Sequence, residues 1–130
     1  MDIAKELGAK EGAWTQKLSL YVPDKDKDGT EVADNERWVK QAREVLSRIG
    51  RGCMALPPGD GTWEKESGEI IWEKTTLVYC FVDPDRFEAN VKNLRAFLHR
   101  FGRETNQGEV VVEFDGRFYH IEKFEDQAGV

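Results

Sequence analysis

The chain has 130 residues and a net charge of -6, and 39% of its residues are hydrophobic. That length suits one domain, and seven Phe, four Trp and three Tyr can build a core, which excludes a disordered acidic tail. The acidic balance disfavours nucleic-acid binding, and neither a membrane span of roughly 20 apolar residues nor a signal peptide is visible, so we expect a soluble, cytoplasmic protein.

The chain begins with an arm and a first strand. Residues 1–14 contain charges and two glycines, and we expect a flexible or partly helical arm there. From Thr15 to Val22, apolar and polar residues alternate, which predicts a strand with one buried face. Pro23 ends this strand because it cannot donate a hydrogen bond to a neighbouring strand.

A helix is predicted from Asp34 to Ile49, because apolar residues recur there at helical spacing and charged residues fill the other side. Asp34 is the expected N-cap, and Gly50 is expected to end the helix in the left-handed conformation.

The middle of the chain is predicted to supply two more strands. Gly52–Leu56 is a short apolar strand, residues 57–61 form a stiff turn region, and Glu64–Glu69 is a charged hairpin tip. The strand from Ile70 to Val82 ends in six apolar residues, which favours a central place in the sheet.

The second predicted helix has the most regular apolar spacing in the chain, from Phe87 to Phe101. Asp83 should cap it, Pro84 suits its first turn, and Gly102 should close it.

A β-hairpin follows, because Asp115-Gly116 separates two alternating runs, Val110–Phe114 and Arg117–Lys123. A two-residue turn pairs Phe114 with Arg117 and fixes the register. It places Val111, Glu113, Phe118 and His120 on one face.

The order of elements predicts an α+β protein with the ferredoxin-like split βαβ plan (βαββαβ) and an extra C-terminal strand that forms a hairpin. Two helices would cover one face of an antiparallel sheet, with the first and third strands central. Residues 15–124 would form this single domain, and residues 125–130 a C-terminal tail.

Several segments together resemble a family of short bacterial α+β proteins known only as a domain of unknown function. They are LSLYV (18–22), DGTEVADNERW (28–38), PPGDGTW (57–63) and GEIIWEKTTLVYCFV (68–82). The resemblance covers about residues 18–82 and places Trp38, Gly61, Trp63, Ile70 and Glu73 on the positions of the family's motifs. The chain lacks the secreted N-terminus of many members and has an extra hairpin. The resemblance implies an α+β fold and no activity.

Asp24, Asp26 and Asp28, followed by Gly29, resemble the start of a calcium loop, in which alternating carboxylates point at one centre. The rest of that loop fits poorly, because Asn35 stands where a bidentate Glu is needed. We favour a solvated loop that leads into a helix, with a weak calcium site as the alternative. A metal-dependent nuclease site at this strand end is disfavoured by the acidic balance. No other cofactor is expected, and Cys53 and Cys80 are read as apolar residues without metal or disulfide.

The face of the sheet away from the helices carries the remaining candidates. His120 with Glu113 or Glu73 has the residue types for acid–base chemistry, and an exposed cross-strand pair is the alternative. Trp63, Trp72, Val111 and Phe118 are candidate binding-surface residues, and core packing is an equal explanation for the tryptophans.

We favour a non-catalytic binding or regulatory domain, because helices cover only one face of a single sheet and an apolar reverse face rarely stays in water. That face would make a homodimer or higher homo-oligomer, or bind an unknown protein or small molecule. An enzyme with a pocket on the same face and a calcium-responsive module are the alternatives.

Overall fold

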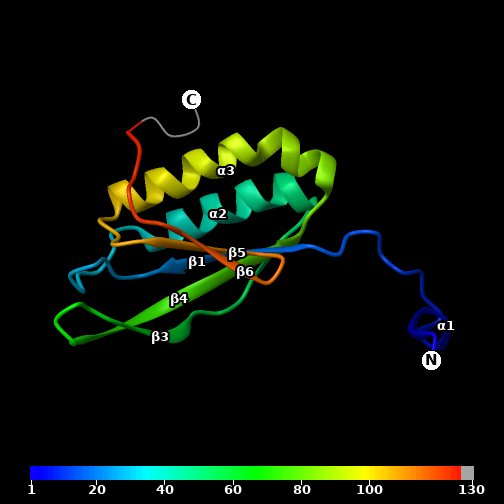
Figure 1. Cartoon of the computed structure of the whole chain (residues 1–130), viewed down its shortest axis with the longest axis horizontal. Coiled ribbons are helices and arrows are strands. Elements are labelled where there is room, and N and C mark those ends of the chain that lie inside the picture. The colour runs from blue at the N-terminus through cyan, green and yellow to red at the C-terminus, as the bar shows by residue number, and fades with distance from the viewer. Residues whose placement is uncertain (127–130) are drawn as a thin grey trace.

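The computed structural model describes residues 1–126 as two layers, with a helical layer packed on one face of a β-sheet (Figure 1). The elements in chain order are α1 (Ile3–Leu7), β1 (Lys17–Pro23), α2 (Asn35–Gly50), β2 (Met54–Ala55), β3 (Gly59–Glu64), β4 (Ile70–Phe81), α3 (Pro84–Glu104), β5 (Val110–Phe114) and β6 (Arg117–Ile121).

The sheet confirms the predicted α+β class and split βαβ plan. Its strand order is β2-β4-β1-β5-β6, and every pairing within it is antiparallel. Strands β1 and β4 are central because each β-helix-β connection leaves a gap that the other unit's strand fills. The β5–β6 hairpin has the expected register, with Phe114 opposite Arg117 and Val111 opposite His120.

Strand β3 corrects the expectation of a stiff turn at residues 57–61. Gly59–Glu64 pairs with Ile70–Thr75 over six consecutive residue pairs. The glycines and prolines of this segment have the composition of a turn, but the free edge of the long strand β4 supplies hydrogen-bond partners that override it. The β3–β4 hairpin extends beyond the end of β1 (Figure 1). Just after β1, Asp24 N donates a hydrogen bond to Lys74 O of β4 at 2.9 Å.

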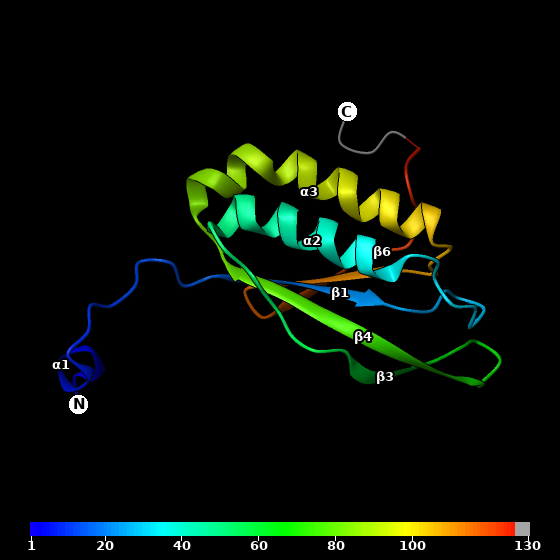
Figure 2. The same ribbon diagram turned by 180° about the vertical axis from the view of Figure 1, so that it is seen from behind.

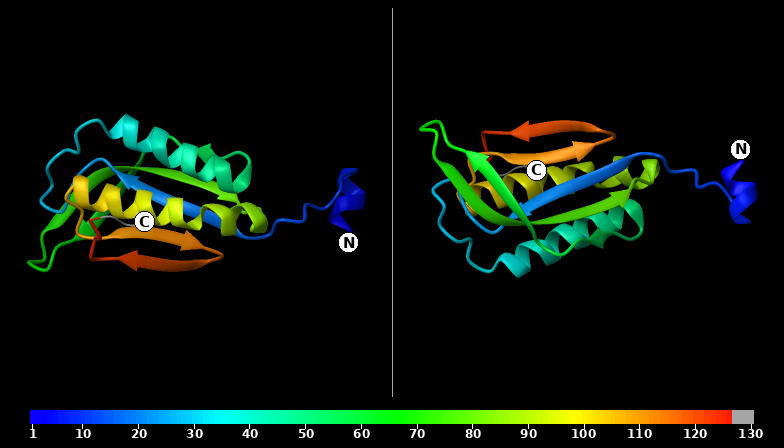
Figure 3. Two further views of the ribbon diagram at one scale, coloured as in Figure 1. Left: turned by 90° about the horizontal axis from the view of Figure 1, so that it is seen from above. Right: turned by 90° about the horizontal axis from the view of Figure 1, so that it is seen from below.

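The core lies between the sheet and helices α2 and α3, which run side by side over it (Figures 2 and 3). Alternate residues of the strands point into it, as the period-two pattern of β1 predicts. Its buried members are Leu18, Leu20, Val22, Val78, Cys80, Val82, Val110 and Val112 beneath Trp38, Ala42, Leu46, Ile49, Leu94, Phe97, Leu98 and Phe101.

Both ends of α2 differ from the prediction. The Asp34 side chain makes no capping hydrogen bond, because its backbone is left-handed (φ 56°), and it pairs instead with Arg37 at 3.5 Å. Gly50 belongs to the helix, and Arg51 takes the left-handed conformation (φ 67°). A Cβ on Gly50 would lie 2.7 Å from both Cys80 Cβ and Phe81 O, so this glycine permits close packing of α2 on β4.

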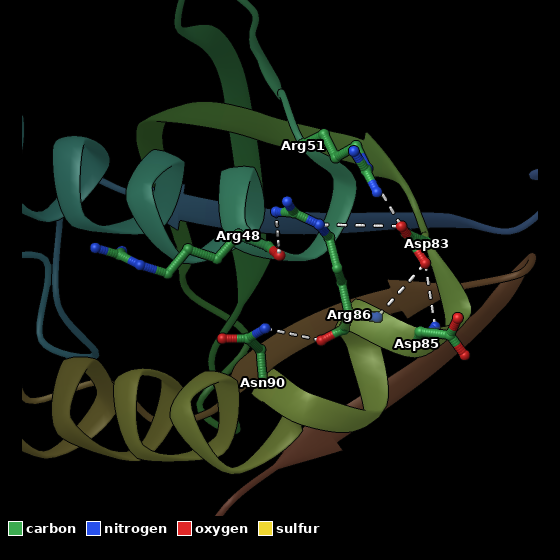
Figure 4. Close-up of polar contacts among 6 residues, drawn as sticks. All are labelled: Arg48, Arg51, Asp83, Asp85, Arg86 and Asn90. Carbon is green, nitrogen blue, oxygen red and sulfur yellow. Dashed lines mark hydrogen bonds and ion pairs between the residues drawn. The ribbon is translucent and has the colours of Figure 1, made fainter.

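Helix α3 begins as predicted, with Asp83 as N-cap and Pro84 in the first turn. Asp83 Oδ1 accepts hydrogen bonds from Asp85 N at 3.1 Å and Arg86 N at 3.5 Å, and its Oδ2 lies 3.4 Å from Arg51 Nε (Figure 4). Arg86 also donates to Arg48 O, at 3.3 Å. This buried carboxylate therefore ties the start of α3 to the end of α2.

Gly102 does not close α3, which continues to Glu104. The Phe124 ring lies against Gly102, in the space that a Cβ would fill. Glu125 N donates to His99 Nδ1 at 3.0 Å, so the chain after β6 packs against α3. The predicted tail, residues 125–130, falls partly outside the described residues, because residues 127–130 are not among them.

Helix α1 lies apart from the two-layer body, at the end of an extended segment (Figure 3). It is capped at its start by Asp2 and at its end by Gly8, and it buries none of its residues. Across residues 1–126, no helix is long and apolar enough to cross a membrane.

Candidate functional site

Figure 3 (right) shows the sheet face opposite the helices. A cleft of about 870 Å³ lies on this face. Successive side chains of a strand point to opposite faces of the sheet. In β4, Glu73, Thr75 and Leu77 line the cleft, while the alternate residues Thr76 and Val78 are buried beneath the helices. The cleft extends from β3, across β4 and β1, to the β5–β6 hairpin.

Three aromatic residues contribute to the walls, namely Tyr21, Trp63 and Phe118. The rings of Tyr21 and Phe118 are 6.3 Å apart and tilted by 38°. The Tyr21 hydroxyl donates to Glu113 Oε1 at 3.4 Å. Burial, followed by the charge and hydrogen bond of Glu113, raises the pKa of Tyr21, so the phenol stays neutral and keeps its proton.

The cleft is acidic. Six carboxylate residues line it, and none of its described lining residues is Lys, Arg or His. Asp60 and Glu64 alternate with Gly59, Gly61 and Trp63, so their side chains point to the other side of β3, where Asp60 pairs with Lys74. Glu66, Glu73, Glu109 and Glu122 therefore supply the negative charge of the cleft. The carboxylates are Asp60, Glu64, Glu66, Glu73, Glu109 and Glu122. A concave surface of this kind attracts cations and disfavours phosphates.

Glu73 is the most perturbed of these carboxyl groups. It lies in β4 opposite Gly61 and is partly buried. Burial, together with the nearby charge of Asp24, raises its pKa from 4.5 to about 7, although Lys25 opposes the shift. A carboxyl group with this pKa can accept or donate a proton at neutral pH, which is what acid–base catalysis requires.

The structure separates the proposed acid–base pairs. His120 Nδ1 lies 3.2 Å from Glu109 Oε2, whereas Glu113 accepts from Tyr21. Glu73 lines the cleft, and neither His120 nor Glu113 is among the residues that do so. His120 and Glu113 therefore make separate contacts, because Glu109 in the loop before β5 lies against His120 and Tyr21 of β1 lies against Glu113.

Of the predicted binding residues, Trp63, Val111 and Phe118 line the cleft. Trp72 does not line it. Trp72 is next to Glu73, whose side chain faces the cleft, so Trp72 points to the other face of the sheet, where it is 67% exposed. The two tryptophans of the β3–β4 hairpin therefore lie on opposite faces.

The three acidic residues of the loop after β1 are held by hydrogen bonds within the chain. Asp24 Oδ1 accepts from Lys74 N at 2.9 Å, and Asp26 Oδ1 accepts from Asp28 N at 2.8 Å. Asn106 Nδ2 donates to Asp26 and Asp28, at 3.2 and 3.1 Å. Within the described part of the chain, no group of three His, Cys, Asp or Glu residues is arranged to hold a metal ion. These carboxylates thus anchor the loop to β4 and to the residues after α3.

Sequence reasoning missed Tyr21, Gly59, Gly61 and Glu109 as cleft residues. The pattern Gly59-x-Gly61-x-Trp63 has the period of a strand, and reading it so would have placed these two glycines and Trp63 on one face.

Cys53 and Cys80 are both free, and burial raises the pKa of Cys80 to about 11, which keeps this thiol protonated.

Comparisons with known proteins identify the fold. No family model and no curated protein matches the chain, so the resemblance to a domain of unknown function was wrong.

Two solved structures are similar over most of their length. A phage SAM lyase in complex with S-methyl-5'-thioadenosine has 17% identity and a TM-score of 0.62, and a phage SAM lyase in the apo state has 18% identity and a TM-score of 0.59. Each match covers 88% of this chain and 94% of the other. At this identity the likeness shows a shared small α+β fold.

Proposed function

We propose that this chain is a small enzyme that binds S-adenosylmethionine in the open-face cleft and cleaves it to S-methyl-5'-thioadenosine. The observation that carries the proposal is the cleft itself, which combines aromatic walls, surplus negative charge and Glu73 with a pKa of about 7. The similarity of nearly the whole fold to phage SAM lyase supports the same class of substrate.

The charge of the cleft fits this substrate. S-adenosylmethionine has a positively charged sulfur and an ammonium group, and both carboxylates and aromatic faces attract cations. Glu73, Glu109 and Tyr21 line one cleft and supply both kinds of contact. The thioether product has lost the sulfonium charge, so the same surface holds the product less strongly than the substrate.

The reaction breaks the bond between sulfur and the four-carbon side chain, and the electron pair stays on sulfur. The side chain leaves by one of two routes. In the first, its own carboxylate attacks the carbon bonded to sulfur and closes a ring. In the second, a base removes a proton from the adjacent carbon and a double bond forms. Glu73 serves as the base in the second route, and in the first route it orients the ammonium group.

The test is to incubate the purified chain with S-adenosylmethionine and measure S-methyl-5'-thioadenosine by chromatography. If Glu73 is the base of the second route, Glu73→Gln should lower the rate by at least about 100-fold, the lower range for a general acid–base group. A smaller loss would favour the first route, in which Glu73 orients the ammonium group. Glu88→Gln, at an exposed position of α3 outside the cleft, is the matched control and should leave the rate unchanged. If the unsubstituted chain forms no S-methyl-5'-thioadenosine, the proposed function is wrong.

Self-association through the open face is a second proposal, and it is compatible with the first. Phe81 and Phe118 are 50% and 58% exposed, and the strand period places both on this face. Sedimentation at several micromolar concentrations tests it, and a mass of one chain throughout would contradict it.

A further inference from the structure

Strand β3 begins at Gly59 and contains a second glycine, Gly61, although its backbone requires neither. Gly59 and Gly61 are not among the glycines with positive φ, and the β3–β4 register is regular from Gly59 to Glu64. Neither left-handed backbone nor a β-bulge explains these residues. Glycine weakens a strand interior, and its remaining common role is to let a ligand or another backbone approach closely.

The packing of the chain does not explain Gly59 either. A Cβ on Gly59 would meet no atom within 4 Å. A Cβ on Gly61 would lie 3.1 Å from Thr75 Oγ1 and 3.5 Å from Glu73 Cγ, which is a tight fit beside flexible side chains. Gly50, by contrast, would bring its Cβ to 2.7 Å from the backbone oxygen of Phe81. The empty space above Gly59 is therefore not needed by any described part of the protein.

That space belongs to the cleft. Gly59 and Gly61 both line it, and they share its face with Trp63, because residues two apart on a strand point to the same side. Their partners on β4 are Thr75 and Glu73. The β3 side of Glu73 is thus a strip of bare backbone with an indole ring at one end.

We infer that this strip, Gly59 to Gly61, receives the adenine ring of the ligand and that Gly59 sets the size of base the cleft accepts. The inference rests on the proposed function. A purine is wide and flat, so it fits against backbone that has no side chain, and its face can stack on an aromatic ring such as Trp63. The side of the cleft beyond Glu73, with Tyr21 and Glu109, is then left for the charged part of the substrate.

The same geometry gives a size-selective position that can be altered without disturbing the fold. A leucine at Gly59 would place its side chain in open space inside the cleft, and its backbone conformation is one that any residue adopts. Gly52 provides the matched control, because a Cβ there also meets no atom within 4 Å, its φ is not positive, and it lies outside the cleft.

The experiment measures binding of S-methyl-5'-thioadenosine by calorimetry to the unsubstituted chain, Gly59→Leu and Gly52→Leu. Gly59→Leu should weaken binding at least about tenfold, because the leucine side chain would take the space that the adenine ring needs. Gly52→Leu should not change the affinity. Thermal unfolding of both variants checks that they are folded. If Gly59→Leu is unfolded, Gly59→Ala replaces it, with a smaller loss of affinity expected.

The possible results separate the two proposals. No binding by the unsubstituted chain overturns the proposed function, and this inference with it. Binding by the unsubstituted chain that Gly59→Leu retains in full overturns the placement of adenine alone. Loss of affinity in both leucine variants would also overturn it, because the effect would then not depend on the cleft.

Discussion

The two faces of strand β4 differ in what determines their residues. On the covered face, Val78 is fully buried and Cys80 lies against Gly50, so each side chain is fixed by the helices above it. On the open face, Glu73 and Leu77 line a cleft, and a Cβ on Gly59, opposite Thr75, would meet no atom within 4 Å. The covered face is thus explained by the packing of the protein on itself. The open face retains features, such as a carboxyl group with a raised pKa and a strip of bare backbone, that do not serve the packing of the core.

The largest expected difference between the faces is in the cost of removing a leucine. Leu20→Ala, on the covered face, should lower the free energy of unfolding by about 2–5 kcal/mol because it leaves a cavity in a closed core. Leu77→Ala, on the open face, should cost about 1–2 kcal/mol because solvent can enter the space. Urea unfolding of both variants measures the gap, and equal losses would mean that the open face is covered.

Asp34 and Asp83, which stand at the N-termini of α2 and α3, should contribute unequally to the stability of the helical layer. Asp83→Ala should lower the free energy of unfolding by about 1–3 kcal/mol, because the buried carboxylate accepts two backbone hydrogen bonds and faces Arg51. Asp34→Ala, whose side chain makes no capping bond, should stay within about 0.5 kcal/mol of the unsubstituted chain. Chemical unfolding checks this, and a reversed order would contradict the role of Asp83 shown in Figure 4.

The smallest of the three effects has the opposite sign and depends on pH. Glu73 has a folded-state pKa of about 7 against an ordinary 4.5, so the folded state holds its proton more tightly than the unfolded state. The resulting penalty is absent below pH 4.5, grows as the pH rises and is complete above pH 7. Glu73→Gln should therefore stabilise the protein at pH 8 by about 1–2 kcal/mol, after allowance for solvent screening, and by almost nothing at pH 4. Thermal unfolding at both pH values measures it, and a destabilisation at pH 8 would falsify the raised pKa.

The sequence predicted the parts of the fold that depend on neighbouring residues and missed those that depend on distant partners. The Asp-Gly turn fixed the β5–β6 register, and Asp83-Pro84 marked the start of α3, because both depend on neighbouring residues. Gly50 and Gly102 were misread as helix ends, since each is required by a distant partner, Cys80 for the first and Phe124 for the second. Strand β3 was missed for the same reason, because its partner β4 outweighs its turn-like composition.

The candidate site was predicted only in outline. Trp63, Phe118 and Glu73 were named as candidates for the open face, but the sequence offered no reason to leave Trp72 out. Which side of the hairpin faces the cleft depends on the β3–β4 register. The partner of His120 depends on where the loop before β5 places Glu109. These are contacts between segments, and residue spacing carries no information about them.

The sequence alone determined the alternation of strands and helices, the two layers and the existence of an uncovered sheet face, because periodicity and turn chemistry are local properties of the chain. Only the tertiary structure decided what that uncovered face contains. The pairing of the strands and the β3–β4 hairpin bring carboxylates, aromatic rings and bare glycines from β1, β3, β4 and β6 into one cleft. The burial that moves the pKa of Glu73 likewise exists only once those segments have assembled.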